Sequence, residues 1–344
     1  MGSGLMRAFV VTAPGEAEVR EVEPPVAVPG EVVVDVHRVG VCGTDVEFFT
    51  GEMQYLHEGA AAYPLRLGHE WCGVVSAVGE GVDASWIGRR VIGDTMLGCR
   101  TCHRCRRGDQ HVCADRSEVG IRAGRAGALA EQLAVPVWSL HALPDSVDDV
   151  AGALVEPGGN ALRAVEGADL APGDRLLVLG PGTIGLLVAL LARARGAEVH
   201  LLGESDRSLR FARSLGFDNA WYEPDLPGLR WDAVVDASNA SYLPAKALDL
   251  VEPSRRAVYI GLAGSPSHID TRTLALKDVT AVGVLSASPG LAGAIEAYAS
   301  GDVDPRPIVA TTVGLEGVAD VLAGRRPAGS GHGPKVHVDP RIAD

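Results

Sequence analysis

Four cysteines in one short stretch of the chain have the spacing of a metal site. They fall within a 15-residue window: Cys99, Cys102, Cys105 and Cys113. Two residues separate the first from the second and the second from the third, and seven residues separate the third from the last. Thiolates so spaced can surround one zinc ion and leave no ligand position for water. An iron–sulfur cluster is the alternative, but ferredoxin runs end on a shorter gap followed by proline, whereas Ala114 follows here. The spacing predicts a structural zinc, with His103 and His111 on the surface of the lobe.

A second set of possible ligands is scattered along the chain. Taken singly, each has an ordinary explanation: Cys42 as a buried apolar residue, His69 as a hydrogen-bonded core histidine, Glu156 as a first-turn helix acid before Pro157. Together with Glu70 they supply one sulfur, one imidazole and carboxylates, a ligand set that suits zinc with a position open for substrate. The sixth cysteine, Cys72, is expected to be a buried core thiol.

A glycine-rich turn follows an apolar run and opens a second one. It fits the pattern G-x-G-x-x-G with the residues Gly180, Pro181, Gly182, Thr183, Ile184 and Gly185. Glycines at these positions let a pyrophosphate approach the backbone and lie on a helix N-terminus. The alternative is a turn tightened by glycine for structural reasons only, but the strand before it and the helix after it favour a dinucleotide site.

An acidic residue ends the next predicted strand. Glu204 lies 24 positions beyond Gly180, where a carboxylate accepts hydrogen bonds from the ribose hydroxyls of NAD and repels the 2′-phosphate of NADP. Ser205, Arg207 and Arg210 lie close by and leave NADP open. The sequence therefore predicts NAD, with NADP as the alternative.

Two kinds of segment must position these residues. Residues 6–150 alternate short Val-rich runs with glycine and proline, a pattern that predicts a β-rich, barrel-like domain. From about residue 160, strands alternate with helical stretches at 184–195, 206–215 and 243–251, which predicts a doubly wound parallel sheet of the Rossmann type. The run 335–338 has strand character again. The expected fold is α/β, with a catalytic domain of residues 1–160 completed by 298–344 and a dinucleotide-binding domain of 161–297.

Composition and charge exclude several classes of protein. The chain has 344 residues, 47% hydrophobic and 22% charged, which is typical of about two globular domains. Its net charge of −13 and the lack of a long basic stripe disfavour nucleic acid as a partner. The longest uncharged stretch, 176–192, is too short for a membrane span and contains the glycine turn. Charges near the N-terminus interrupt any signal-type apolar core, so the expected location is the cytoplasm.

The order of motifs resembles one known family. Cys42-Gly43-Thr44-Asp45, Gly68-His69-Glu70, the four-cysteine lobe, Glu156-Pro157 and the glycine turn follow one another as in the zinc-dependent medium-chain alcohol dehydrogenases. The resemblance covers nearly the whole chain and implies a GroES-like catalytic domain. Glu70 and the Glu156-Pro157 pair resemble the polyol branch, which includes sorbitol, threonine, glucose and aminocyclitol dehydrogenases.

The resemblance implies a role for each matching residue. Cys42 and His69 become direct zinc ligands, with Glu70, Glu156 or both completing the set. Thr44 matches the hydroxyl that takes the alcohol proton, and Asp45 matches the acid that orients the histidine ligand. Glu47 stands where many relatives carry a histidine that passes the proton outward, which leaves the path beyond Thr44 open.

These roles imply a reversible oxidation of a secondary alcohol to a ketone, with hydride passing to NAD(P) and two zinc ions per chain, one catalytic and one structural. Two other functions stay open: a metal-independent reductase, and a non-catalytic dinucleotide-binding protein on the same fold. The resemblance also implies a small polar substrate such as a polyol, sugar or aminocyclitol. The segment 52–64 matches no pattern and is expected to determine specificity. A homodimer or homotetramer is expected, paired through the edge strand predicted at 281–285.

Overall fold

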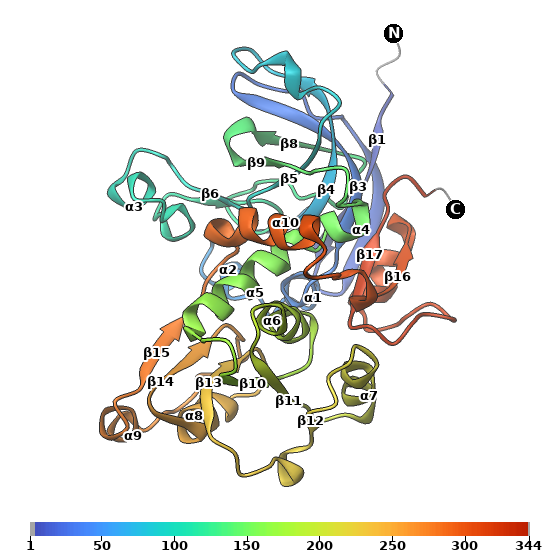
Figure 1. The fold of residues 1–344 in the computed structure, drawn as a ribbon. Coiled ribbons are helices and arrows are strands. Elements are labelled where there is room, and N and C mark those ends of the chain that lie inside the picture. Colours follow the sequence, from blue (N-terminus) through green and yellow to red (C-terminus); the bar gives the residue numbers. More distant parts are fainter. Residues whose placement is uncertain (1–3, 343–344) are drawn as a thin grey trace. The chain divides into compact units, whose positions relative to one another are not determined.

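The computed structural model describes residues 4–342 and divides into two compact units. The first unit runs to Glu156 and includes Val309–Gly331 and the chain from Lys335 onward. The second unit comprises Pro157–Ile308 and His332–Pro334. The two units carry different secondary structure, as Figure 1 shows.

The first unit is rich in strands. Its main sheet has seven strands in the order β16-β17-β3-β4-β5-β9, with β8 also paired to β3. The strands are β3 (Glu31–Gly40), β4 (Glu70–Val78), β5 (Arg90–Gly93), β8 (Gln132–Pro136), β9 (Leu140–Ala142), β16 (Val309–Val313) and β17 (Lys335–Val338). Two smaller sheets pair β1 (Met6–Ala13) with β2 (Glu16–Val22) and β6 (Met96–Leu97) with β7 (Ser117–Glu118). The short helices are α1 (Gly43–Thr50), α2 (Gln54–His57), α3 (His103–Arg106), α4 (Asp149–Gly152) and α11 (Val318–Leu322).

Strand β3 organises this unit. It pairs antiparallel with β4, β8 and β17, and its five valines are all buried, which explains its apolar sequence. Val32, Val34 and Val36 belong to the main hydrophobic cluster of the unit. Because β17 pairs with the end of β3, residues from the C-terminal region lie beside the segment that leads to Cys42.

The second unit is built on a parallel sheet of six strands in the order β12-β11-β10-β13-β14-β15. The strands are β10 (Arg175–Leu179), β11 (Glu198–Leu202), β12 (Ala220–Trp221), β13 (Trp231–Asp236), β14 (Val251–Tyr259) and β15 (Thr280–Gly283). The helices are α5 (Val155–Ala168), α6 (Thr183–Ala194), α7 (Asp206–Ser214), α8 (Leu243–Leu250), α9 (Thr271–Leu276) and α10 (Leu291–Ser300). The predicted fold class, α/β with a Rossmann-type sheet, is confirmed.

The long uncharged stretch of the sequence forms β10, the glycine turn and α6. Residues from Gly185 to Ala192 of α6 are all buried, which explains why this helix is apolar on every side. None of the helices within residues 4–342 is both long enough and apolar enough to span a membrane.

The boundaries between the units differ from the expected ones. The chain passes to the second unit after Glu156, inside α5, rather than at 160, and returns to the first unit at Val309 rather than at 298. The later return has a physical reason: Leu291 and Tyr298 of α10 are buried, and the Val303 N–H donates to the Ala297 carbonyl, so the segment after α10 stays with that helix.

Candidate active site and metal centres

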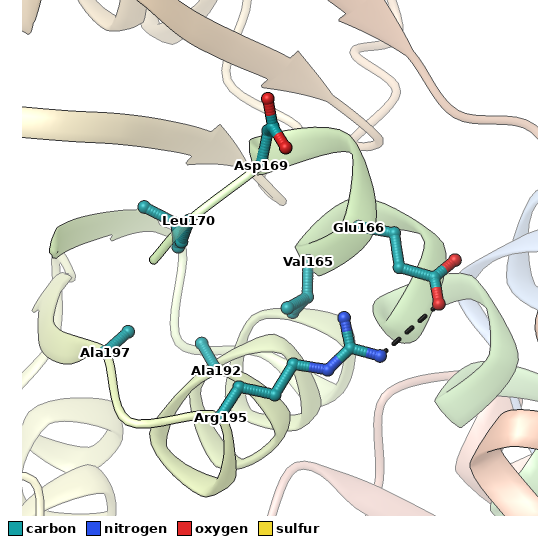
Figure 2. Close-up of a pocket in the computed structure, with 7 residues that line it drawn as sticks. All are labelled: Val165, Glu166, Asp169, Leu170, Ala192, Arg195 and Ala197. Atoms are coloured by element: carbon teal, nitrogen blue, oxygen red, sulfur yellow. Dashed lines mark hydrogen bonds and ion pairs between the residues drawn. The ribbon is translucent and has the colours of Figure 1, made fainter. Parts of the chain in front are cut away.

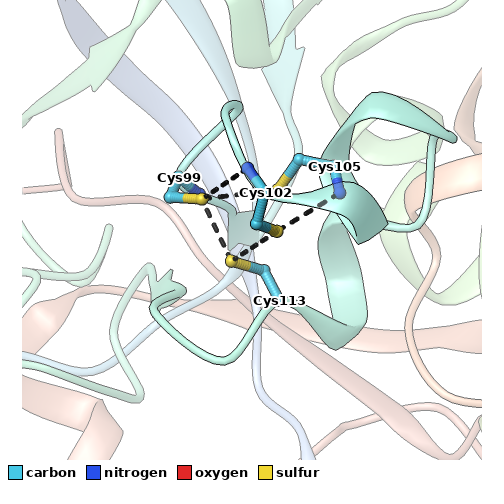
Figure 3. A group of neighbouring side chains, drawn as sticks. All are labelled: Cys99, Cys102, Cys105 and Cys113. Carbon is cyan, nitrogen blue, oxygen red and sulfur yellow. Dashed lines mark hydrogen bonds between the residues drawn. The ribbon is translucent and has the colours of Figure 1, made fainter.

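The four cysteines of the lobe converge on one point. Their sulfur atoms all lie within 4.8 Å of one another, and Figure 3 shows the side chains turned toward a common centre. The Sγ atoms of Cys102 and Cys113 are 3.7 Å apart, and those of Cys99 and Cys105 are 4.0 Å apart. Zinc–sulfur bonds of about 2.3 Å in a tetrahedron require sulfur separations of about 3.8 Å, so the geometry fits a closed zinc site.

The backbone around the lobe favours thiolates. The N–H groups of Cys102 and Cys105 donate to the sulfurs of Cys99 and Cys102 at 3.3 and 3.5 Å. The Thr101 hydroxyl, together with nearby N–H groups, lowers the pKa of Cys99 to about 6, whereas burial raises the pKa of the Cys105 thiol to about 12. Thiolates are the form of cysteine that binds zinc.

The two histidines of the lobe differ. His103 is exposed, as predicted. The expectation that His111 lies on the surface is wrong, because a 3₁₀ turn at Gln110–Val112 buries its side chain to 7% exposure. That turn follows α3 closely in the chain and leads directly into Cys113.

The second group of ligands forms where β3 and β4 lie side by side. Cys42 follows the end of β3 and immediately precedes α1, His69 immediately precedes β4, and Glu70 opens β4 opposite Gly40. One ligand atom from each of the three residues lies within 4.8 Å of the others. Glu156 is half-buried near the start of α5 and does not belong to this group among the described residues.

Asp45 lies behind the histidine. Its Oδ1 is 3.5 Å from His69 Nδ1 and accepts from the Gly68 N–H, while its Oδ2 accepts from the Cys42 N–H at 2.9 Å. Burial lowers the pKa of His69, but the Asp45 carboxylate outweighs this effect and the pKa lies well above its ordinary value. A carboxylate at Nδ1 favours the tautomer that leaves Nε2 as the metal-binding atom, the arrangement typical of zinc-bound histidines.

A buried lysine that the sequence did not single out completes the site. Lys335 Nζ of β17 donates to both carboxylate oxygens of Glu70, at 2.9 and 2.6 Å, and to the Val41 carbonyl at 2.9 Å. The side chains of Lys335 and Glu70 are only 3% and 2% exposed. Burial lowers the pKa of Lys335, but Glu70 and Cys42 outweigh it, so the amine stays charged. A Cβ on Gly40 would collide with Glu70, so glycine is required there.

Removing Lys335 is expected to destabilise this unit. In Lys335→Met, Glu70 loses its counter-charge, and breaking a buried pair from one side costs about 3 kcal/mol or more in the free energy of unfolding. The double variant Lys335→Met/Glu70→Gln is expected to recover most of that loss. Urea unfolding of the metal-free proteins measures the loss in the single variant and the recovery in the double variant. The control is Lys277→Met, which removes a lysine that donates to backbone carbonyls. Equal stability of Lys335→Met and native protein contradicts the argument.

Thr44 and Glu47 lie one turn apart on α1. Thr44 is half-buried and Glu47 is exposed. Partial burial, followed by the charge of Glu52, raises the pKa of Glu47. Residues three apart on a helix share a face, so both can serve one path between Cys42 and solvent.

The glycine turn has the contacts of a phosphate-binding loop. Gly180 has a φ of 93°, and a Cβ on Gly185 would collide with the Gly180 carbonyl, so strand and helix pack closely here. Among residues 4–342, no atom outside the adjoining residues lies within 4 Å of the Cβ position of Gly182, which leaves the helix start open to a ligand. Thr183 and Ile184 form the first turn of α6, whose free N–H groups suit a pyrophosphate.

Glu204 lies just beyond the end of β11 and is exposed. Its Oε1 accepts a hydrogen bond from the hydroxyl of Tyr242 at 3.1 Å. Arg210 forms an ion pair with Asp206 at 3.2 Å, whereas Arg207 is exposed on the first turn of α7. The sequence did not indicate Tyr242, which precedes α8 and is 38 residues from Glu204.

Comparison with known proteins covers both units. Residues 28–145 match the family described as alcohol dehydrogenase GroES-like domain, and residues 183–300 match the zinc-binding dehydrogenase family. The sorbitol dehydrogenase of Halalkalibacterium halodurans is 31% identical over 83% of this chain and 85% of its own length. The chain belongs to the zinc-dependent medium-chain alcohol dehydrogenases.

Two solved structures with a similar fold were determined with nicotinamide cofactors. RspB from Escherichia coli CFT073, complexed with NADH, superposes with a TM-score of 0.89 at 25% identity and covers 98% of this chain and 99% of its own. A zinc-binding dehydrogenase from Sinorhizobium meliloti 1021, bound to NADP, gives 0.88 at 27% identity with the same coverage. The chain is an NAD(P)-dependent alcohol dehydrogenase, and the alternatives of a metal-independent reductase and a non-catalytic binding protein are not favoured.

A cavity of about 210 Å³ elsewhere on this dehydrogenase takes no part in the site. It is lined by Val165, Glu166, Asp169, Leu170, Ala192, Arg195 and Ala197. Figure 2 shows the Glu166–Arg195 ion pair, 3.3 Å long, at one side of it. None of the predicted catalytic, metal-binding or cofactor-binding residues lines this cavity.

Proposed function

We propose that this dehydrogenase oxidises a secondary alcohol of a polyol, sugar or aminocyclitol to a ketone, reversibly and with NAD, at a zinc ion held by Cys42, His69 and Glu70. The observation that carries the proposal is the convergence of these three ligands within 4.8 Å. Glu156, which lies outside this group, stays the alternative to Glu70 or an additional ligand, directly or through water. The sulfur, imidazole and carboxylate donors are those that zinc prefers at catalytic sites.

Each remaining residue of the site has a stated task. Bound zinc would supply a Lewis acid that lowers the pKa of the alcohol, and bound dinucleotide would supply the hydride acceptor. The Thr44 hydroxyl takes up the alcohol proton as it gives up its own toward Glu47, which passes a proton to solvent. Asp45 holds the His69 ring in place. Lys335 fixes Glu70 and offsets its negative charge, which otherwise adds to that of Cys42.

The substrate class rests on the relatives and on one segment of the chain. The related sorbitol dehydrogenase acts, by its name, on a polyol. The segment 52–64, which we assign to specificity, is anchored through Tyr55: its hydroxyl donates to Glu118 at 3.2 Å and accepts from Arg116 at 3.1 Å. Because Arg116 also donates to the Cys113 carbonyl, the cysteine lobe supports this segment.

A substrate panel tests the proposal directly. Zinc-loaded enzyme is mixed with NAD and single polyols, sugars or aminocyclitols, and the absorbance of NADH is followed. We expect turnover with at least one of them, loss of turnover after chelation, and recovery when zinc is returned. Undiminished turnover by metal-free protein overturns the zinc mechanism.

The cofactor preference rests on Glu204. A carboxylate beside the ribose accepts from its hydroxyls and repels a 2′-phosphate. Arg210 is held by Asp206, which leaves Arg207 as the nearby arginine for a phosphate. We therefore assign NAD over NADP.

Glu204→Ala is expected to lose much of the preference for NAD. A repulsion of about 1–3 kcal/mol between carboxylate and phosphate corresponds to about 10–100-fold in relative catalytic efficiency. The measurement is kcat/KM with each cofactor in native enzyme and variant, with Glu252→Ala, an acid on β14, as the control. A native enzyme that prefers NADP shows that Arg207, rather than Glu204, reads the ribose.

We further propose two zinc ions per chain, a homodimer or homotetramer, and a cytoplasmic location. Strand β15 forms one edge of the parallel sheet, and Thr280, Ala281 and Gly283 on it are exposed. Leu276, in the preceding helix α9, is 87% exposed, which adds apolar surface beside that edge. None of the six cysteines, all of which lie among residues 4–342, forms a disulfide, as suits a reducing compartment.

A further inference from the structure

Tyr242 links two carboxylates at the carboxyl end of the parallel sheet. Its hydroxyl lies 3.1 Å from Oε1 of Glu204, which follows β11, and 3.3 Å from Oε2 of Glu223, which follows β12. Lys246 of α8 forms an ion pair with the other oxygen of Glu223. One phenol thus joins the residue proposed to read the ribose to a neighbouring acid–base pair; Figure 1 places β11, β12 and α8 in the same unit.

The single proton of the phenol favours Glu204. A hydroxyl donates one hydrogen, and the two carboxylates compete for it. Lys246 offsets the charge of Glu223 and lowers its pKa, whereas Glu204 forms no ion pair with a cation among residues 4–342. Burial, followed by the hydrogen bond to Glu204, raises the pKa of Tyr242 to about 12, so the phenol keeps its proton at neutral pH.

We propose that Tyr242 is a positioning residue for the cofactor: its hydroxyl holds Oε1 of Glu204, so that Oε2 is presented to the ribose diol of NAD. The inference rests on the proposed role of Glu204. A glutamate that is exposed on the surface samples several rotamers, and fixing one of them before the ligand arrives lowers the entropy lost on binding.

The same cluster disfavours a phosphate. Glu204 and Glu223 bring two negative charges to the phenol and Lys246 brings one positive charge, so the group is negative overall. A 2′-phosphate would meet this charge, whereas a neutral diol would donate hydrogen bonds to it. Tyr242 as a whole residue is 49% exposed, which leaves room for a ligand beside Glu204.

The test measures binding rather than turnover. Dissociation constants for NADH and NADPH are obtained from nicotinamide fluorescence in the full-length protein. In Tyr242→Phe, which keeps the ring and loses the hydroxyl, we expect NADH to bind about three- to tenfold more weakly, as for loss of one partly exposed charge-assisted hydrogen bond, with little change for NADPH. Tyr222→Phe is the matched control, because Tyr222 makes the same kind of bond to Asp206 but does not contact Glu204. In Tyr222→Phe, the ratio of the NADPH dissociation constant to the NADH dissociation constant should equal that of the native protein.

Two further variants, Glu204→Gln and the double variant Tyr242→Phe/Glu204→Gln, test the role of Tyr242 separately from the role of Glu204. If Tyr242 acts through Glu204, the double variant discriminates between the cofactors no less than Glu204→Gln alone. A reduced ratio in Glu204→Gln with a native ratio in Tyr242→Phe overturns the inference and leaves the ribose site intact. A native ratio in Glu204→Gln overturns both. Thermal unfolding of each variant checks that the fold is kept.

Discussion

Thr44→Val is expected to lower turnover by about 10²–10⁴ while the affinity for NADH stays native. Valine keeps the shape and half-burial of threonine on α1 but cannot accept a proton. Dinucleotide binding depends on the second unit, where the glycine turn lies, so the loss should appear in kcat alone. Stopped-flow measurement of the hydride step, together with the dissociation constant of NADH, checks both halves of this expectation.

Two variants on the same helix serve as controls for Thr44→Val. Thr44→Ser keeps the hydroxyl and is expected to retain most of the rate. Thr50→Val removes an exposed threonine hydroxyl at the end of α1 that donates to the Glu47 carbonyl, and is expected to leave turnover unchanged. If Thr44→Val turns over at the native rate at neutral pH, then water or Glu47 takes the alcohol proton and the relay through Thr44 is discarded.

Sites built from neighbouring residues could be predicted from the sequence. The four cysteines lie in one short loop, so their spacing alone restricts how far apart the sulfurs can be. The glycine turn is equally local, since the strand before Gly180 and the helix after Gly182 are adjacent in the chain. In both cases the short chain segment restricts where the functional groups can lie, so the spacing of the residues is enough to predict the site.

Sites that depend on strand pairing could not be predicted in the same way. Lys335 lies 265 residues from Glu70 and reaches it because β17 pairs with β3, which in turn pairs with β4. A pattern in a single sequence gives no register for such pairings. The only local signal was one lysine opening a short apolar strand, and a lysine at that place is ordinarily read as exposed.

The scattered zinc ligands were grouped through the family resemblance rather than through the pattern of the sequence. The structure brings Cys42, His69 and Glu70 together because the ends of β3 and β4 are neighbours. Tyr242 was missed for a related reason: its partner Glu204 follows another strand of the sheet, and only the sheet order places the two side chains together.

Cys99→Ser is expected to release one of the two zinc ions and to lower the stability of the protein substantially. A structural zinc contributes its binding free energy to folding, about 10–16 kcal/mol in small zinc-finger peptides, so loss of even a third of this amount is large for a single domain. Serine is a poor zinc ligand, and the three remaining sulfurs, drawn together in Figure 3, would repel one another as thiolates. Elemental analysis and thermal unfolding measure the two effects.

Cys72→Ser is the matched control for this change. Cys72 is also buried in the first unit, but its sulfur lies 3.2 Å from the Asp149 carbonyl rather than among the lobe cysteines. The variant is therefore expected to keep both zinc ions even if it is less stable.

Cys42→Ser is expected to show the opposite pattern to Cys99→Ser: the protein stays folded and keeps the lobe zinc, but it lacks turnover. Native protein that binds one zinc or none after full loading overturns the two-site assignment. Cys99→Ser that retains two zinc ions overturns the assignment of one ion to the four sulfurs of the lobe.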